Sequence, residues 1–175
     1  GAPLINALYL QDIKTHKDTQ LDGNSPLGVF EASFINNTEI AYLLNKTVFT
    51  DDQPNTSYKR DLYIFNLSAK KKELIPYTGD PAGTKGSNAI TEKHRLKVSP
   101  NNRYISYLTN GQIYVYDRKS GKASLSPKTQ NTITDYSWGA DSQTLSAIDK
   151  NAIYHLTSDC KLLSTANTSN DGVRF

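Results

Sequence analysis

The side chains best suited to binding chemistry gather in two long polar stretches in the first half of the sequence. One stretch runs from about residue 45 to residue 60, and the other runs from residue 77 to residue 91. Long connections without their own structure often carry function, and the acidic, basic and phenolic groups here could engage an ionic or hydrogen-bonding partner. We therefore predict a binding patch made of Asp51, Asp52, Tyr58, Lys59, Arg60, Asp80 and Lys85. The alternative interpretation is an insertion that is tolerated without any ligand.

Groups that could hold a metal or act as a nucleophile are sparse and scattered. They are His16, His94, His155 and Cys160. The pair Asp51 and Asp52 would bind a cation only together with loop carbonyls, and solvation of both carboxylates is the simpler interpretation. The sequence contains no GxSxG, HExxH or glycine-rich phosphate-binding motif. We expect no catalytic residues, no metal and no cofactor, and we expect Cys160 to be an incidental surface thiol.

Composition and charge narrow the class of partner. The chain has 175 residues, with 20 Lys and Arg against 17 Asp and Glu, so its formal charge is +3. So small a net charge gives no reason to expect nucleic acid as a partner. No apolar run approaches the ~18 residues needed to cross a bilayer, so any membrane contact is expected only through an anchor outside this chain. A single cysteine excludes an internal disulfide.

The elements that would position these side chains come from an internal repeat. Residues 98–116 align without a gap with residues 138–156, which matches Ile105 with Leu145 and Ser106 with Ser146. The copies cover approximately residues 1–26 (partial), 27–78, 91–127, 131–166 and 170–175 (partial). A repeat of about forty residues is typical of arrays of small supersecondary units.

Each full copy is predicted to contain four short strands, which we call A to D. In the copy at 91–127, these strands are expected over residues 95–99, 104–108, 112–116 and 122–125. Asn110 and Gly111 between strands B and C are typical of a type I′ hairpin, because both central residues of that turn have positive φ. Four antiparallel strands per repeat, without helical periodicity between them, predict the blade of a β-propeller.

The same residues resemble a known family. Residues 99–107 (SPNNRYISY) and 112–122 (QIYVYDRKSGK) are similar to the two halves of the TolB-type WD-like β-propeller repeat, and residues 138–142 (WGADS) resemble its first turn. The resemblance covers nearly the whole chain. It implies a bacterial protein that is periplasmic or otherwise extracytoplasmic, like TolB-like proteins and the ectodomains of regulators similar to CadC and ToxR.

The expected architecture is an all-β β-propeller domain, or a fragment of one, over residues 1–175. It would have about three full four-stranded blades plus split terminal strands, and we expect it to be part of a larger ring. A ring assembled from two chains and a four-bladed monomer are the alternatives. Exposed edge strands would permit self-association. Because strands alternate in direction, the D-to-A and B-to-C connections share one face, which would bring the two polar stretches together.

These features favour a non-enzymatic binding or sensing module that recognises a protein, a peptide or a small ligand. A protein or peptide is the partner that we expect first. The periplasmic domain of a membrane-anchored transcriptional regulator would fit this description, by analogy of fold. One alternative is part of the gating propeller of a prolyl-oligopeptidase-like serine peptidase, whose GxSxG nucleophile would lie elsewhere in the gene product. Another is a scaffold that pairs through its edge strands.

Overall fold

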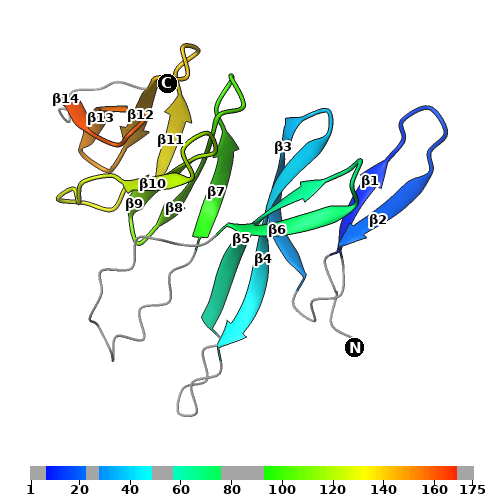
Figure 1. Cartoon of the computed structure of the whole chain (residues 1–175). Coiled ribbons are helices and arrows are strands. Elements are labelled where there is room, and N and C mark those ends of the chain that lie inside the picture. The colour runs from blue at the N-terminus through cyan, green and yellow to red at the C-terminus, as the bar shows by residue number, and fades with distance from the viewer. Residues whose placement is uncertain (1–6, 23–27, 49–56, 76–92, 169–175) are drawn as a thin grey trace. The chain divides into compact units, whose positions relative to one another are not determined.

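A computed structural model describes residues 7–22, 28–48, 57–75 and 93–168, and Figure 1 shows their course. These residues form strands and turns but no helix, and so none that could span a membrane. The strands are β1 (Leu8–Gln11), β2 (Asp18–Asp22), β3 (Val29–Asn36), β4 (Glu39–Val48), β5 (Ser57–Asn66), β6 (Lys71–Ile75), β7 (Lys93–Val98), β8 (Tyr104–Thr109), β9 (Gln112–Asp117), β10 (Lys122–Leu125), β11 (Asp135–Trp138), β12 (Thr144–Ile148), β13 (Ala152–Thr157) and β14 (Leu162–Asn167).

Three of the sheets contain four antiparallel strands each, joined in the order of the sequence. They are formed by β3 to β6, β7 to β10 and β11 to β14, while β1 and β2 form a separate hairpin (Figure 1). Strands β7 to β10 begin and end within two residues of the positions predicted from the sequence. Four-stranded antiparallel meanders are the blades of a β-propeller, so the predicted all-β propeller fold is confirmed.

The chain divides into two compact units. The first unit spans Gly1–Pro76 and Gly86–Lys93, and the second spans Tyr77–Lys85 and His94–Phe175. Among the described residues, the first unit therefore holds β1 to β6, and the second holds β8 to β14 with the part of β7 beyond Lys93.

The repeat of about forty residues is visible in the turns that join β7 to β8 and β11 to β12. Asn102 and Ser142 both adopt the left-handed conformation, with φ of 62° and 58°. Each donates its backbone N–H to the carbonyl three residues earlier, on Ser99 at 2.8 Å and on Gly139 at 2.9 Å. The two turns also touch, because the backbone N–H of Asn101 donates to the Ser142 hydroxyl at 3.0 Å. Equivalent turns thus tie neighbouring blades of the second unit together.

The hairpin turns that join β1 to β2, β5 to β6, β9 to β10 and β13 to β14 share a second left-handed position. It is occupied by His16 (φ 54°), Lys70 (φ 51°), Gly121 (φ 67°) and Cys160 (φ 66°). In the first three copies, a side-chain acceptor four residues earlier binds a backbone N–H inside the turn; these acceptors are Asp12, Asn66 and Asp117. Asp and Asn favour such turns because their short side chains reach the backbone, whereas glycine alone adopts positive φ without strain.

The tight turn between β8 and β9 follows the sequence prediction. Asn110 and Gly111 both have positive φ, at 50° and 71°. This confirms the type I′ hairpin, in which the two central residues twist in the sense of the flanking strands. The short turn lets β8 and β9 pair along their whole length, from Tyr104 opposite Asp117 to Thr109 opposite Gln112.

The insertion predicted as a loop near residues 45–60 is in part an extension of two strands. β4 and β5 each contain ten residues, and they pair from Glu39 opposite Asn66 to Val48 opposite Ser57. The expectation of a structureless loop over the whole insertion is therefore wrong. Pairs such as Asn45 with Arg60 continue the ladder, and every second pair of an antiparallel ladder adds two backbone hydrogen bonds.

The core of the first unit joins the β1–β2 hairpin to one face of the β3–β6 sheet. Leu8 and Leu21 of the hairpin pack against a cluster that includes Tyr42 and Phe65. The Tyr42 hydroxyl donates to the buried Asp22 carboxylate at 2.6 Å. Burial, and then this bond to a carboxylate, raise the pKa of Tyr42 well above its usual value. The hydrogen bond between Tyr42 and Asp22 fixes the position of the hairpin on the sheet within an otherwise apolar contact.

The core of the second unit lies between the β7–β10 and β11–β14 sheets. Leu108, Ile113 and Val115 from one sheet meet Leu145 and Leu156 from the other. β8 is buried at every position, whereas β12 alternates between buried and exposed residues. One face of the β11–β14 sheet thus faces solvent within the part of the chain that the structure describes.

Cys160 belongs to this core, which corrects the prediction of a surface thiol. Its side chain is 3% exposed, and Sγ lies 3.8 Å from the carbonyl oxygen of Ile113. Burial, with a smaller contribution from Asp159, raises the pKa of Cys160 to about 12. A buried thiol of this kind behaves as a small apolar side chain and is chemically inert.

Candidate functional site

The binding patch predicted from the sequence lies mostly outside the described residues. Asp51, Asp52, Asp80 and Lys85 fall in the segments that the structure does not describe. Tyr58 and Lys59 belong to β5, opposite Thr47 and Lys46 of β4. The patch as a binding site therefore stays a prediction.

Arg60 is the one member of the patch whose side chain is described, and it has structural partners. It is 7% exposed, and its Nε donates to Oδ1 of Asn45 at 2.9 Å while Nη1 donates to the carbonyl of Lys93 at 2.8 Å. The guanidinium also lies over the ring of Phe30, 3.5 Å from its centroid. These contacts satisfy a buried charge, as burial of arginine requires.

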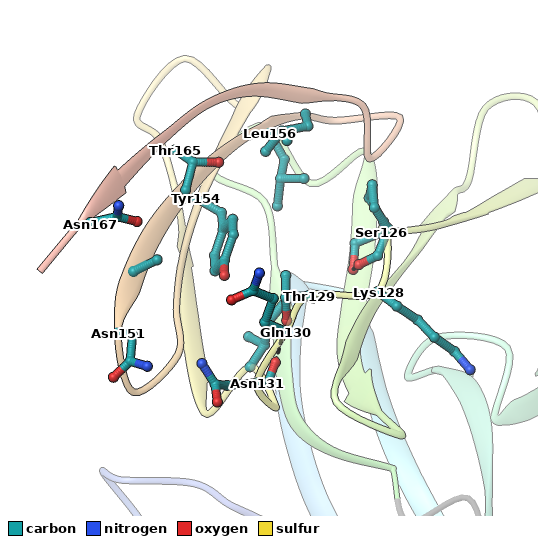
Figure 2. A pocket seen from close by; sticks show the side chains of 14 residues that line it. Ser126, Lys128, Thr129, Gln130, Asn131, Asn151, Tyr154, Leu156, Thr165 and Asn167 are labelled. Carbon is teal, nitrogen blue, oxygen red and sulfur yellow. Dashed lines mark hydrogen bonds between the residues drawn. The ribbon is translucent and has the colours of Figure 1, made fainter.

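A pocket of about 390 Å³ lies in the second unit, between the β13–β14 ladder and the connection from β10 to β11 (Figure 2). Its volume is in the range of small-ligand sites. The lining residues are Ser126, Pro127, Lys128, Thr129, Gln130, Asn131, Ile133, Asn151, Ala152, Tyr154, Leu156, Leu162, Thr165 and Asn167. None of these residues belongs to the predicted patch, so sequence reasoning missed this site.

One wall of the pocket is formed by three cross-strand pairs of the β13–β14 ladder. Ala152 lies opposite Asn167, Tyr154 opposite Thr165, and Leu156 opposite Leu162. Residues directly opposite one another in a ladder share a face of the sheet, so all six side chains point to the same side. A shift of register next to Leu156 leaves Leu163 as an extra residue, and this bulge puts both Leu162 and Thr165 on the pocket side.

The other wall is the connection that runs from Ser126 to Thr134. Its start is held to β9, because Ser126 N donates to the Ile113 carbonyl at 2.8 Å and Ile113 N donates to the Ser126 hydroxyl at 2.9 Å. Its end is held to β12, because Thr134 N donates to the Ile148 carbonyl at 2.9 Å. Bonds at both ends fix the position of the intervening residues, as a preformed site requires.

Asp149 organises the turn beside the pocket. Its carboxylate accepts the backbone N–H groups of Asn151 and Ala152, both at 2.8 Å, and the Tyr154 hydroxyl at 2.7 Å. Burial alone would raise the pKa of Asp149, but these bonds and one from the Asn131 side chain outweigh it, so the pKa is lowered. The bond to Asp149, helped by burial, raises the pKa of Tyr154. Tyr154 therefore stays neutral, with its ring fixed in the wall.

The lining combines an apolar base with a rim of neutral polar groups. Ile133, Ala152 and Leu156 are buried, while the rim carries amides and hydroxyls (Figure 2). Side-chain amides both donate and accept hydrogen bonds. Lys128 is the single charged residue among those that line the pocket. Such a surface suits a neutral or anionic organic group with an apolar part.

The sequence held one signal for this site. The segment from Ser126 to Thr134 is a D-to-A connection of nine residues that contains Pro127, and Asn151 lies in a B-to-C turn. The expectation that these two kinds of connection share a face agrees with their meeting at one pocket.

Comparison with known proteins identifies the fold. No family model matches the chain, and no curated protein is similar to it. Among solved structures, the extracellular domain of BT4673 from B. thetaiotaomicron is 18% identical with a TM-score of 0.58, over 93% of this chain and 20% of that one. Dipeptidyl peptidase 4 from Porphyromonas gingivalis is 9% identical with a TM-score of 0.62, over 92% and 30%.

TolB from Acinetobacter baumannii is 14% identical with a TM-score of 0.52, over 92% of this chain and 37% of that one. The resemblance to TolB-type propellers predicted from the sequence is thus supported at the level of fold. The chain spans less than two fifths of the length of each of these three proteins. At such low identity the similarity concerns the fold alone.

Proposed function

We propose that this chain is a non-enzymatic β-propeller binding module and that the pocket beside β13 and β14 is its ligand site. The observation that carries the proposal is the pocket itself, with a volume of about 390 Å³ between two walls that are fixed by hydrogen bonds. Propeller blades present such sites between rigid strands, and loops supply their selectivity.

The chemistry of the lining favours a peptide or a small neutral or anionic molecule. The buried base would cover an apolar group, and the amides of Gln130, Asn131 and Asn151 would bond to polar groups around it. Lys128 extends away from the other labelled side chains of the lining (Figure 2), so its charge would act on a ligand only at longer range, where it would disfavour a cation. Tyr154 offers a neutral ring rather than a charge, because its hydroxyl is bonded to Asp149.

A sensing role outside the cytoplasm is the setting that we propose. It is supported by the similarity in fold to the extracellular domain of BT4673, a protein described as a candidate one-component system. In such a protein, a bacterial propeller would report a ligand to a regulator through a membrane anchor outside this chain. This part of the proposal rests on similarity of fold.

The similarity in fold to dipeptidyl peptidase 4 supports a second candidate function, part of a peptidase propeller. In that case the chain would guide peptides and the catalytic groups would lie in another domain. The two candidates differ in the remainder of the gene product. A domain with a GxSxG nucleophile would favour the peptidase, and one apolar span of ~20 residues would favour the anchored sensor.

Protein-detected NMR with a diverse fragment library tests the binding site directly. We expect some fragments to shift the backbone amides of Thr129, Asn131 and Tyr154, and the variant Asn131→Ala to weaken their binding. The variant Asp52→Ala, in the patch predicted from the sequence, is the matched control and should bind them like the wild type. If only the amides near Asp52 shift, the ligand site is the patch predicted from the sequence and not this pocket. If no fragment binds, the proposed function is contradicted.

A further inference from the structure

β14 differs in charge from the other outermost strands of its kind. β2, β6 and β10 all contain charged residues, with the sequences DTQLD, KKELI and KASL, whereas β14 reads LLSTAN. Every residue of β14 is exposed, and Leu162 and Leu163 are 50% and 58% exposed. Natural edge strands usually carry charges that oppose pairing with another chain. Apart from its bulge at Leu163, β14 lacks this protection.

The pairing of β14 with β13 determines which residues of β14 direct their backbone N–H and C=O groups outward. β14 pairs with β13 on one side, and no second neighbour is present in the described part of the chain. Thr168 N donates to the Asn151 carbonyl at 2.8 Å, which makes Ala152 and Asn167 a non-hydrogen-bonded pair of the antiparallel ladder. By the same alternation, the backbone N–H and C=O groups of Thr165 and Asn167 point away from β13.

The same two residues contribute side chains to the pocket. Thr165 and Asn167 lie opposite Tyr154 and Ala152 and line the pocket with them (Figure 2). The edge that could receive a strand therefore adjoins the cavity that could receive a side chain. An added strand places alternate side chains on each face of the sheet. A residue on the pocket side of such a strand would lie at the rim of the cavity.

We propose that β14 binds an extended peptide of another protein as a fifth strand and that one aromatic side chain of this peptide occupies the pocket. The inference rests on the proposed function of the pocket as a ligand site. Main-chain bonds to Thr165 and Asn167 would supply affinity, and the pocket would supply selectivity. The buried base and the ring of Tyr154 suit an aromatic group. No acidic residue is among those that line the pocket, and this favours a neutral or acidic peptide over a basic one.

Three variants separate the roles of the edge and the pocket. Thr165→Pro removes an outward N–H that makes no bond to β13, and proline is tolerated at such edge positions. Asn167→Trp keeps the backbone but covers the pocket. Ala166→Trp places the same bulk on the opposite face of β14, where Ala166 lies opposite Ile153, and it is the matched control for Asn167→Trp. Circular dichroism should show the wild-type strand spectrum for all three.

The experiment selects phage-displayed random peptides of about twelve residues, long enough to form a strand, on the wild-type protein. We expect the selected peptides to contain a shared aromatic residue and few Lys or Arg. Their affinity should fall at least about tenfold on Thr165→Pro, on Asn167→Trp and when the aromatic residue becomes Ala, and it should stay unchanged on Ala166→Trp. The selected peptides should also be synthesised in two N-methylated forms, one for each set of alternate backbone nitrogens. Only the set whose N–H groups face β14 should abolish binding when it is methylated, and this result does not depend on any protein variant.

Several results would overturn the inference. Strand addition would be excluded if the selected peptides bind the Thr165→Pro variant and still bind when either set of alternate backbone nitrogens is methylated. Failure to select any peptide, while fragments still shift the pocket amides in the NMR experiment, would reject this inference and leave the proposed function standing. Failure of both experiments would reject both. A concentration-dependent dimer of the wild type that Thr165→Pro abolishes would identify a second copy as the occupant.

Discussion

Ser106 and Ser146 occupy equivalent positions in adjacent repeats, yet Ser106 is completely buried and Ser146 is exposed. The Ser106 hydroxyl accepts from the Trp138 indole N–H and from the Tyr136 hydroxyl, both at 2.9 Å, and donates to the carbonyl of Lys97 at 3.2 Å. The Ser146 hydroxyl lies 3.1 Å from Nδ1 of His155 on an exposed face. The same residue type thus has two different roles in two copies of one repeat.

The first prediction follows from this difference. Ser106→Ala should lower the free energy of unfolding by about 1–2 kcal/mol, because it removes the acceptor of the partly buried Trp138 indole N–H, whereas the Tyr136 hydroxyl keeps its bond to the Arg95 carbonyl at 2.8 Å. Ser146→Ala, the matched control, should change it by less than about 0.5 kcal/mol. Urea denaturation of both variants measures the effect, and equal losses would show that the burial of Ser106 does not matter.

A second prediction concerns Tyr154. Tyr154→Phe removes the hydroxyl that donates to Asp149 at 2.7 Å and leaves the ring in place. We expect a loss of about 1–2 kcal/mol in the free energy of unfolding, since a bond to a charged acceptor is lost. Thermal unfolding measures it, with Thr165→Ala on the opposite strand as a control for a change at the pocket surface. A neutral result would mean that water replaces the phenol.

The third prediction is a pH dependence. Two bonds from Arg103, at 2.9 Å and 2.8 Å, lower the pKa of Asp117 well below its ordinary value of 3.8. A carboxylate with a depressed pKa in the folded state contributes stability that is present above the unfolded pKa and is lost as the pH falls through the folded pKa. Asp117→Asn should therefore destabilise the protein at neutral pH, and the difference from wild type should shrink from roughly pH 5 downwards.

Urea midpoints measured from pH 7 down to about pH 2.5 test this dependence. The control is Asp159→Asn, which breaks a solvent-exposed pair with Lys161 at 2.8 Å. Exposed pairs contribute little, so this variant should follow the wild-type profile more closely. A gap between Asp117→Asn and wild type that is constant with pH would contradict the assignment to the Asp117 carboxylate.

The fourth prediction uses the left-handed position at Lys70. This residue has φ of 51° in the turn between β5 and β6, a conformation that costs an L-residue ~1 kcal/mol. Lys70→Gly should therefore stabilise the protein by up to about 1 kcal/mol. Lys70→Ala removes the charge but keeps the strain, so it should not stabilise. If both variants behave alike in thermal unfolding, the charge rather than the backbone determines the effect.

Much of the fold could be predicted because local signals and long-range packing agree. Asn110 and Gly111 specify the hairpin by their backbone preferences alone, and the matched turns at Asn102 and Ser142 repeat the same geometry in successive copies. Alternation of apolar and polar residues then assigns faces to the strands. The agreement of these levels explains why the boundaries of β7 to β10 were predicted closely.

The candidate site could not be predicted, because pockets depend on contacts between segments. Asn131 and Asn167 are ordinary polar residues in the sequence and become neighbours of one cavity only when the connection from β10 folds over the β13–β14 ladder. The bulge at Leu163 adds to the difficulty, since strict alternation would place Leu162 and Thr165 on opposite faces. Conversely, the sequence predicts Arg60 as a binding group, whereas the structure places its guanidinium over the ring of Phe30 and gives it two hydrogen bonds.

The hairpin turns that join β1 to β2, β5 to β6 and β9 to β10 are built alike and could replace one another. The five-residue segments 12–16, 66–70 and 117–121 each begin with a side-chain acceptor and end at a left-handed residue, although their sequences differ. A protein engineer could therefore transplant one segment into another hairpin, or replace its middle residues with an epitope or a tag, without rebuilding the strands. Charged residues could be added to or removed from these turns without any change to the strands of the blades.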